Sequence, residues 1–231
     1  MNFKIADINI DVVKKDIKHM HLAVYPPDGR VRLSAPKTTK EEKLRLYTIS
    51  KLKWIKKQQK KFREQKREKP RQFINGESHY FLGNRYLLKV IEHDKRTSKV
   101  VKVNRTYIEL HVPKGSTLEK RKRVMEEWYR KHLKEVAAPM IEKWSEKVGV
   151  EVNDWGVRKM KTKWGSCNTD QHRIWLNLEL AKKPKKCVEY IVLHELIHLI
   201  ERKHSDRFVM LLDRYMPTWR VRKEILGRTI Y

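Results

Sequence analysis

The chain has 231 residues, of which 55 are Lys or Arg and 28 are Asp or Glu, so its formal net charge is +27. Hydrophobic residues make up 39% of the chain and include seven Trp, which is enough to bury a core and excludes a disordered tail. No apolar run approaches the roughly 20 residues of a membrane-spanning helix, so we expect no membrane contact. Two cysteines, Cys167 and Cys187, and an N-terminus without a secretory pattern predict a cytoplasmic protein.

Residues 1–112 are predicted to form a basic, strand-rich module with one long helix. Alternating apolar residues predict strands in the first 36 residues, with a hairpin around Pro26-Pro27-Asp28-Gly29. The period then changes to that of a helix over residues 40–68, ended by Pro70. Further short strands are predicted at 79–82, 86–91, 100–103 and 107–112.

Residues 113–231 are predicted to be mainly helical, and the two halves together indicate an α+β fold without an internal repeat. Ser116-Thr117-Leu118-Glu119 resembles a capping box and predicts a helix up to residue 147, kinked at Pro139. Two strands, 155–164 and 173–178, are expected to meet across 168–170. Three helices follow, the first beginning at Pro184.

The predicted helix around residues 51–71 is exceptionally basic. It contains eleven Lys or Arg against two Glu. Like charges one helical turn apart repel each other, so such a density indicates a counter-ion partner. We therefore weigh contact with a polyanion against the simpler interpretation of a solvated surface.

The segment most informative about chemistry is His194-Glu195-Leu196-Ile197-His198, inside the helix that begins at Pro184. Residues four apart share a helix face, so His194 and His198 can direct two imidazole nitrogens at one zinc ion. Glu195 is turned by about 100° from His194, which brings it near the metal as a general base rather than a ligand. The flanking residues are nearly all apolar, and buried His and Glu side chains are costly unless they are hydrogen-bonded or bound to metal.

A catalytic zinc needs a third protein ligand and an open position. The downstream candidates are Glu201, His204, Asp206 and Glu224. Glu201 is about 10 Å along the helix from His194, too far for both to bind one ion. Residues 202–203 are basic, as a last helical turn favours, and residue 205 or 206 can cap the next helix, which leaves His204 in the turn. We predict His204 as the third ligand, with Glu224 as the alternative.

Five segments carry a resemblance to a known family: Lys163–Cys167, Ile174–Asn177, Tyr190–Leu199, Lys203–Ser205 and Pro217–Arg220. The sequence resembles the YgjP-like metallopeptidase-domain family of zincin-fold proteins. The resemblance implies that His194, His198 and His204 bind zinc and that Glu195 is the catalytic acid/base. It also implies a compact zincin core with an edge strand, here residues 174–178, that can pair with an extended substrate. For Lys163–Cys167 we favour a structural role.

We therefore predict a zinc-dependent metallohydrolase, by resemblance a metallopeptidase, in which Glu195 activates zinc-bound water. Candidates for stabilising the oxyanion are Tyr190, Arg158, Lys163 and Arg173. One alternative is hydrolysis of nucleoside triphosphates or another phosphoanhydride, with the basic surplus holding the phosphates. Another is a module that binds nucleic acid or an acidic protein and contains a structural zinc. Glu195 speaks against the latter, because a structural site gains nothing from a base.

Overall fold

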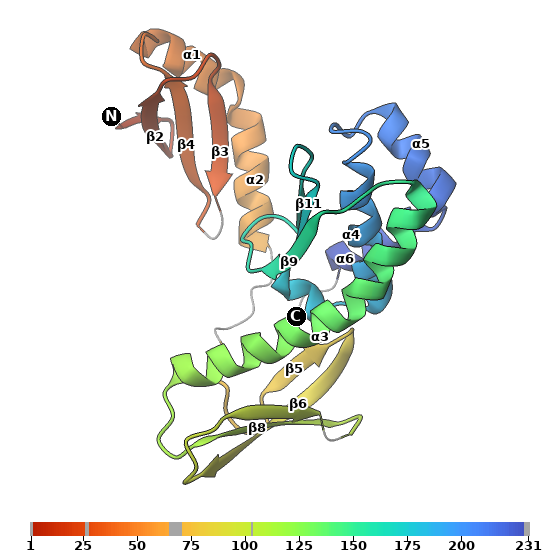
Figure 1. Cartoon of the computed structure of the whole chain (residues 1–231). Helices are drawn as coiled ribbons and strands as arrows, with labels where there is room; N and C mark the ends of the chain where they lie inside the picture. Colours follow the sequence, from red (N-terminus) through yellow and green to blue (C-terminus); the bar gives the residue numbers. More distant parts are fainter. Residues whose placement is uncertain (1, 26–27, 65–70, 103, 229–231) are drawn as a thin grey trace. The chain divides into compact units, whose positions relative to one another are not determined.

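The computed structural model describes residues 2–25, 28–64, 71–102 and 104–228, and it divides into two compact units, residues 1–67 and 68–231 (Figure 1). Each unit has its own hydrophobic core. The described residues form six α-helices and three small sheets, which confirms the predicted α+β class. Within these ranges, no helix combines the length and the apolar character that a bilayer span requires.

The first unit is a four-stranded sheet with two helices packed on one face. In spatial order its strands are β1 (Asn2–Ile5), β2 (Ile8–Lys15), β4 (Arg30–Pro36) and β3 (His21–Tyr25). Apolar residues alternate along β2 and β4, so Ile10, Val12, Val31 and Leu33 lie on one face and are buried against the helices. β3 and β4 pair antiparallel, as predicted for the hairpin, although its turn residues 26–27 lie outside the described ranges.

The prediction of one helix over residues 40–68 is wrong, because the described part forms two helices, α1 (Glu41–Ser50) and α2 (Leu52–Glu64). The chain leaves helical geometry at Lys51, with φ −103° and ψ 0°. Just before this point, the hydroxyls of Thr48 and Ser50 donate to backbone carbonyls four and three residues earlier, respectively. Such bonds compete with the helical ladder and favour a break that the apolar spacing does not reveal. Residues 65–68 lie outside the described ranges.

The second unit begins with a sheet that repeats the connectivity of the first. In spatial order its strands are β5 (Ser78–Phe81), β6 (Asn84–His93), β8 (Tyr107–Pro113) and β7 (Lys99–Lys102), so the four predicted strands are confirmed. In both sheets the first two strands form an antiparallel hairpin, the second runs parallel to the fourth, and the third pairs antiparallel with the fourth. The chain therefore contains a structural repeat, although its residues show no repeated sequence pattern.

The long helix α3 (Leu118–Val148) packs on this second sheet, and its direction changes along its length (Figure 1). Its cap differs from the prediction. Thr117, not Ser116, is the N-cap, and its hydroxyl accepts a hydrogen bond from the N–H of Lys120. The Ser116 hydroxyl instead accepts from Arg121, so no capping box forms. The helix ends at Gly149, whose φ of +74° suits glycine.

The third sheet is small and has the spatial order β10 (Gly165–Asn168), β11 (Arg173–Asn177), β9 (Asp154–Arg158). The predicted strand over 155–164 ends at Arg158, and the separate strand β10 follows it. β10 and β11 form an antiparallel hairpin, while β9 pairs parallel with the other side of β11. β11 is thus the central strand, so the prediction that residues 174–178 form the edge is wrong, and β10 is an edge strand instead.

A 3₁₀ helix (Leu178–Lys182) leads from β11 into α4 (Lys185–Ile197), α5 (Asp206–Tyr215) and α6 (Trp219–Arg228), the three predicted C-terminal helices. The β5–β6 turn anchors the start of α4. The N–H groups of Leu82 and Gly83 donate to the carbonyls of Ala181 and Lys182 at 2.8 and 3.1 Å. Gly83 has φ +86°, and a Cβ there would lie 2.8 Å from Cγ of Pro184, so a glycine is needed beside the N-cap of α4.

The division between residues 67 and 68 does not coincide with the boundary predicted near residue 113. Phe81 and Leu110 from the second sheet share one core with Trp128 of α3 and with Leu180. The sheet buries its apolar face against α3 and the 3₁₀ helix, both of which lie beyond residue 113 in the sequence. Residues 71–113 therefore belong to the same unit as the C-terminal helices.

Candidate active site

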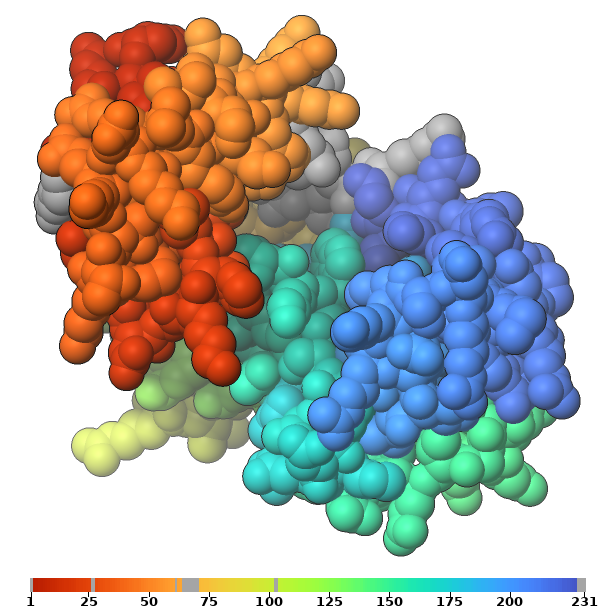
Figure 2. All heavy atoms as spheres, turned by 90° about the horizontal axis from the view of Figure 1, so that it is seen from above, coloured from red at the N-terminus to blue at the C-terminus, as the bar shows by residue number. Residues whose placement is uncertain are grey.

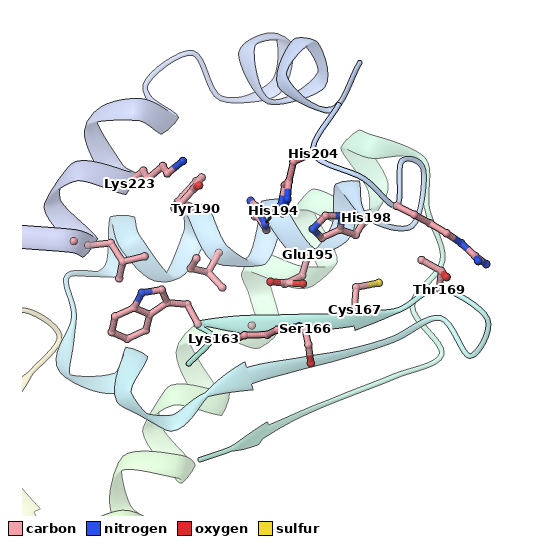
Figure 3. A pocket seen from close by; sticks show the side chains of 16 residues that line it. Lys163, Ser166, Cys167, Thr169, Tyr190, His194, Glu195, His198, His204 and Lys223 are labelled. Carbon is pink, nitrogen blue, oxygen red and sulfur yellow. Dashed lines mark hydrogen bonds between the residues drawn. The ribbon is translucent and has the colours of Figure 1, made fainter. Parts of the chain in front are cut away.

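Helix α4 holds three of the four predicted site residues in a rigid frame. It is among the most buried elements of the second unit, with Val192, Leu193 and Leu196 fully buried. His194 and Glu195 lie on the helix, and His198 is its C-cap. The apolar residues pack on the other faces of the helix. The polar side chains lie on the face of α4 that borders a cavity (Figure 3).

His204 comes from the loop that follows α4. The helix ends earlier than predicted, because the N–H groups of Leu199 and Ile200 form tight turns with carbonyls three residues back. Residues 202–203 therefore lie in the loop rather than in a last helical turn. The hydroxyl of Ser205 caps α5 by accepting from the N–H of Phe208 at 3.4 Å, as predicted for this position. This cap directs His204 back toward α4 (Figure 3).

The three imidazoles converge on one point. Each of His194, His198 and His204 offers a ring nitrogen, and these three atoms lie within 4.8 Å of one another. The Nε2 atoms of His194 and His204 are 3.0 Å apart. Two ligands of a tetrahedral zinc ion are separated by about 3.3 Å, given zinc–nitrogen distances of about 2.0–2.1 Å, so the spacing has the scale of a metal site. Phe208 supports all three rings, with centroid distances of 4.7–4.9 Å.

The surroundings favour the unprotonated imidazoles that metal binding requires. Burial, together with the neighbouring His198, His204 and Lys223, lowers the pKa of His194 to about 3. Burial also lowers the pKa of His198. Nδ1 of His198 lies 3.1 Å from the carbonyl oxygen of Glu201. In the tautomer that donates to this carbonyl, Nε2 of His198 is free to bind a metal.

Glu195 points away from the imidazoles toward β10 and is almost completely buried, with 5% of its surface exposed (Figure 3). Burial raises its pKa to about 8, and the positive charge of Lys163 opposes this shift. Gly165 makes the position possible. A Cβ at residue 165 would lie 2.6 Å from Oε1 of Glu195 and 2.7 Å from its Cγ. Gly165 therefore allows β10 to pass directly beside the carboxyl group.

Asn177 is a structural residue of the site that sequence reasoning did not single out. It is 4% exposed, and its amide donates to the carbonyls of Met160 and Lys163 at 3.0 and 2.7 Å. Its side-chain oxygen accepts from the N–H groups of Met160 and Glu179. These bonds fix the segment that leads into β10. The sequence signal was an amide at the end of an apolar strand, within a segment already noted for its family resemblance.

The cavity that contains these residues has a volume of about 750 Å³ and is lined by sixteen residues from β10, α4, α6 and the loop with His204. On the face of the second unit seen in Figure 2, teal atoms of the β10–β11 region and blue atoms of the C-terminal helices lie next to one another.

Cys167 lines the cavity as a free thiol, and burial, together with the charge of Glu195, raises its pKa to about 11. Such a thiol stays protonated, in agreement with the structural role expected for residues 163–167. Cys187 is free and buried.

The other candidate ligands and oxyanion groups differ in whether the structure brings them to the site. Glu201, Asp206 and Glu224 are not part of the cluster of possible metal ligands among the described residues. Of the four candidate oxyanion groups, Tyr190 and Lys163 line the cavity. Arg158 donates to Ser166 and packs over Trp175, and Arg173 pairs with Asp154. Neither arginine lines the cavity.

Comparison with known proteins gives a family match over most of the chain. A family model described as "YgjP-like, metallopeptidase domain" matches residues 18–229. Among solved structures, the metallopeptidase zymogen of Pyrococcus abyssi abylysin is similar over 40% of this chain and 90% of its own, with 23% identity and a TM-score of 0.36. The zymogen of Methanocaldococcus jannaschii jannalysin is similar over 42% and 90%, with 21% identity and a TM-score of 0.33. The search of curated proteins gave no match.

Proposed function

Because the chain belongs to the YgjP-like metallopeptidase-domain family, we propose that it hydrolyses peptide bonds with one zinc ion held by His194, His198 and His204, and with Glu195 as general base. The observation that carries this proposal is the convergence of three imidazoles from two segments beside one buried carboxyl group. Zinc suits a set of three imidazole nitrogens, and such sites with an open position are catalytic. Bound there, zinc would polarise the scissile carbonyl and lower the pKa of a water molecule toward about 7.

Glu195 is proposed to transfer the proton. Burial raises its pKa to about 8, so the carboxylate takes up a proton readily near neutral pH and can return it to the leaving amine. Lys163 lowers the same pKa, so its charge favours the carboxylate that starts the reaction. Because Gly165 packs against the carboxyl group, little water surrounds it, and the proton stays within the site.

The edge of β10 is the proposed binding strand for the peptide. The N–H of Asn177 donates to the carbonyl of Trp164 at 2.8 Å, so these two residues form a hydrogen-bonded pair at the end of the hairpin. Hydrogen-bonded pairs alternate along antiparallel strands, so the backbone groups of Gly165 and Cys167 point to the open edge. An extended peptide can bond to these groups as an additional strand.

Tyr190 is the proposed donor to the oxyanion. It lies one turn before His194 on α4, with ring centroids 5.8 Å apart, and it lines the cavity. Burial, together with the charge of Glu195, raises its pKa to about 12. The hydroxyl therefore remains protonated and can donate a hydrogen bond to developing negative charge.

The first test separates metal binding from catalysis. We expect about one zinc per chain by elemental analysis in both the wild type and Glu195→Gln, while the variant loses about 10²- to 10⁴-fold in peptide hydrolysis. His204→Ala is expected to lose the zinc. Glu224→Gln, at the alternative ligand position, is the matched control and keeps both zinc and activity. Full activity in Glu195→Gln would remove this residue from the mechanism.

Phosphoanhydride hydrolysis is a second candidate, favoured by the cations Lys163, Arg202 and Lys223 along the cavity. Guanidinium and ammonium groups bind phosphate oxygens strongly. Nucleoside triphosphates are therefore assayed beside peptides, with Glu195→Gln as the common control. Turnover of the nucleotides alone would replace peptide hydrolysis as the proposed reaction.

A polyanion contact through α2 is proposed as a separate property of the first unit. Among the side chains of this helix that the structure describes, five basic ones are exposed, namely Lys53, Lys56, Lys57, Lys60 and Arg63. Ile55 and Leu52 of α2 pack in the core of the first unit, while Trp54 is 42% exposed among the basic residues. The exposed face of α2 therefore offers positive charge, which suits a phosphate backbone better than it suits an apolar partner.

A further inference from the structure

The charged side chains of the active-site cavity are unevenly balanced. Three cations line it, whereas Glu195 supplies the one carboxyl group among the described residues of its lining. Arg202 is neutralised by an ion pair with Asp170. Lys163 and Lys223 form no ion pair with any described side chain. The charge of Lys163 acts on the nearby carboxyl group of Glu195, whereas Lys223 has no carboxylate partner among the described side chains, so the cavity carries a surplus of positive charge.

Both lysines belong to one end of the cavity. In Figure 3, Lys223 and Tyr190 lie on one side of the three histidines, while Thr169 lies on the other. Lys163 precedes β10, at the same end as Tyr190. We call Lys163, Tyr190 and Lys223 the basic end of the cavity.

Packing holds the basic end in place. The ring of Trp219 stacks on that of Tyr190, with centroids 6.2 Å apart and planes inclined by 15°. Nζ of Lys223 lies 5.5 Å from the centroid of the same Trp219 ring. Trp219 is 8% exposed, so it forms a fixed wall against which the lysine and the tyrosine are positioned. An ammonium group ordered in this way loses little entropy when an anion binds.

The direction of β10 determines which part of a bound peptide lies at the basic end of the cavity. The strand runs from Gly165, two residues after Lys163, to Asn168, which precedes Thr169. A peptide that pairs antiparallel with its open edge runs the opposite way, from Thr169 past the histidines to Lys163. The residues that follow the scissile bond therefore reach the basic end.

We propose that this site selects peptides with a carboxylate on the C-terminal side of the scissile bond, attracted by the positive charges of Lys163 and Lys223. The proposal rests on the proposed peptidase function and names its substrate class. The carboxylate has two possible sources, the C-terminus of the peptide or the side chain of an Asp or Glu. In either case the gain comes from charge-assisted hydrogen bonds in a partly enclosed site.

The test uses the full-length, zinc-loaded protein and a matched set of fluorogenic peptides. One sequence is made with Glu, Gln or Lys two residues after the scissile bond, each with a free or an amidated C-terminus. We expect the anionic peptides to exceed the Gln amide by at least about tenfold in kcat/KM, mainly through KM, and to lose this gain at high salt. If only the peptides with a free C-terminus show the gain in kcat/KM, the terminal carboxylate is the group that binds. If the amidated Glu peptide also shows the gain, the side-chain carboxylate binds.

Substitutions of the two lysines test whether they cause the preference for anionic peptides. Lys163→Gln and Lys223→Gln are each expected to reduce the ratio between anionic and neutral peptides to about two. Lys161→Gln is the matched control, because Lys161 is exposed, two residues from Lys163 and outside the cavity lining, and it keeps the ratio. Moving the Glu to the N-terminal side of the scissile bond is expected to abolish the gain.

Two outcomes would overturn the inference, and they are distinguishable from a failure of the proposed function. Equal cleavage of the Glu, Gln and Lys peptides would refute the preference while leaving peptidase activity standing. A gain from Glu on the N-terminal side alone would refute the assigned direction. Hydrolysis of no peptide at all would overturn the proposed function and this inference together.

Discussion

Gly165 is the residue on which the proximity of β10 and Glu195 depends. A methyl group at this position would lie 2.6 Å from Oε1 of Glu195, so either the carboxyl group or the strand must move. Displacing a catalytic group by about 1 Å can cost about 100-fold in rate. We expect Gly165→Ala to keep its zinc and its circular dichroism spectrum but to lose about two orders of magnitude in kcat.

Gly227 provides the matched control for that substitution. It lines the same cavity, yet a Cβ there meets nothing within 4 Å. Gly227→Ala is therefore expected to retain wild-type kcat. Equal loss in both variants would mean that any added methyl group disturbs the cavity, and a fully active Gly165→Ala would show that Glu195 tolerates displacement.

His79 makes the stability of the second unit dependent on pH. It is 1% exposed, its Nε2 lies 2.9 Å from a carboxylate oxygen of Glu77, and burial lowers its pKa from 6.5 to about 4. The unfolded chain binds a proton that the folded chain excludes between these values, so stability is complete above pH 6.5 and is lost as the pH falls toward 4. We expect a loss on the order of 2 kcal/mol in the free energy of unfolding between pH 7.5 and 4.5.

Urea denaturation at several pH values measures this contribution. His79→Gln keeps a polar side chain beside Glu77 without the titration, so its stability is expected to fall less over the same range. Parallel pH profiles for wild type and variant would assign the acid sensitivity to other groups.

At the scale of elements, α2 carries the separate prediction of polyanion binding. Reversing Lys53, Lys57 and Lys60 to Glu is expected to reduce the slope of log affinity against log salt for duplex DNA by about three. Reversing Lys122, Lys131 and Lys134 of α3, which are also exposed, changes the total charge equally and serves as the control. Equal effects of the two triple variants, measured by fluorescence anisotropy, would mean that only net charge matters.

The elements also explain which features the sequence can predict. The spacing of His194 and His198 is a property of one helix, and the cap at Ser205 is local, so both follow from the chain read in order. The break at Lys51 follows hydrogen bonds from the hydroxyls of Thr48 and Ser50 to backbone carbonyls. The spacing of apolar residues contains no information about such bonds. The central position of β11 depends on its parallel pairing with β9, a contact between distant segments. Gly165 owes its role to α4, 30 residues later in the sequence.

At the scale of the whole molecule, the two units are expected to respond differently to metal. His194, His198 and His204 all lie in the second unit, and the first unit has a separate core. Calorimetry should therefore show two transitions, of which zinc shifts only one. At a free zinc concentration 100 times Kd, the gain is about 2.7 kcal/mol, or roughly 5–10 °C for a unit of this size.

Chelation supplies the converse measurement. Removing zinc is expected to return the sensitive transition to its apo temperature and to leave the other unchanged. His204→Ala serves as the control, because zinc should shift the temperature of neither of its two transitions. Movement of both transitions together would mean that the units unfold as one.

The hydrogen bonds from Leu82 and Gly83 to the segment before α4 tie the start of this helix to the β5–β6 turn, which bears on where the chain can be shortened. A truncation that begins at residue 113 keeps every proposed ligand yet removes the turn that supports the N-terminal end of α4. A truncation that begins near residue 71 retains that support. Engineering a minimal catalyst from this chain therefore means cutting at the first unit and keeping a sheet that contributes no residue to the chemistry itself.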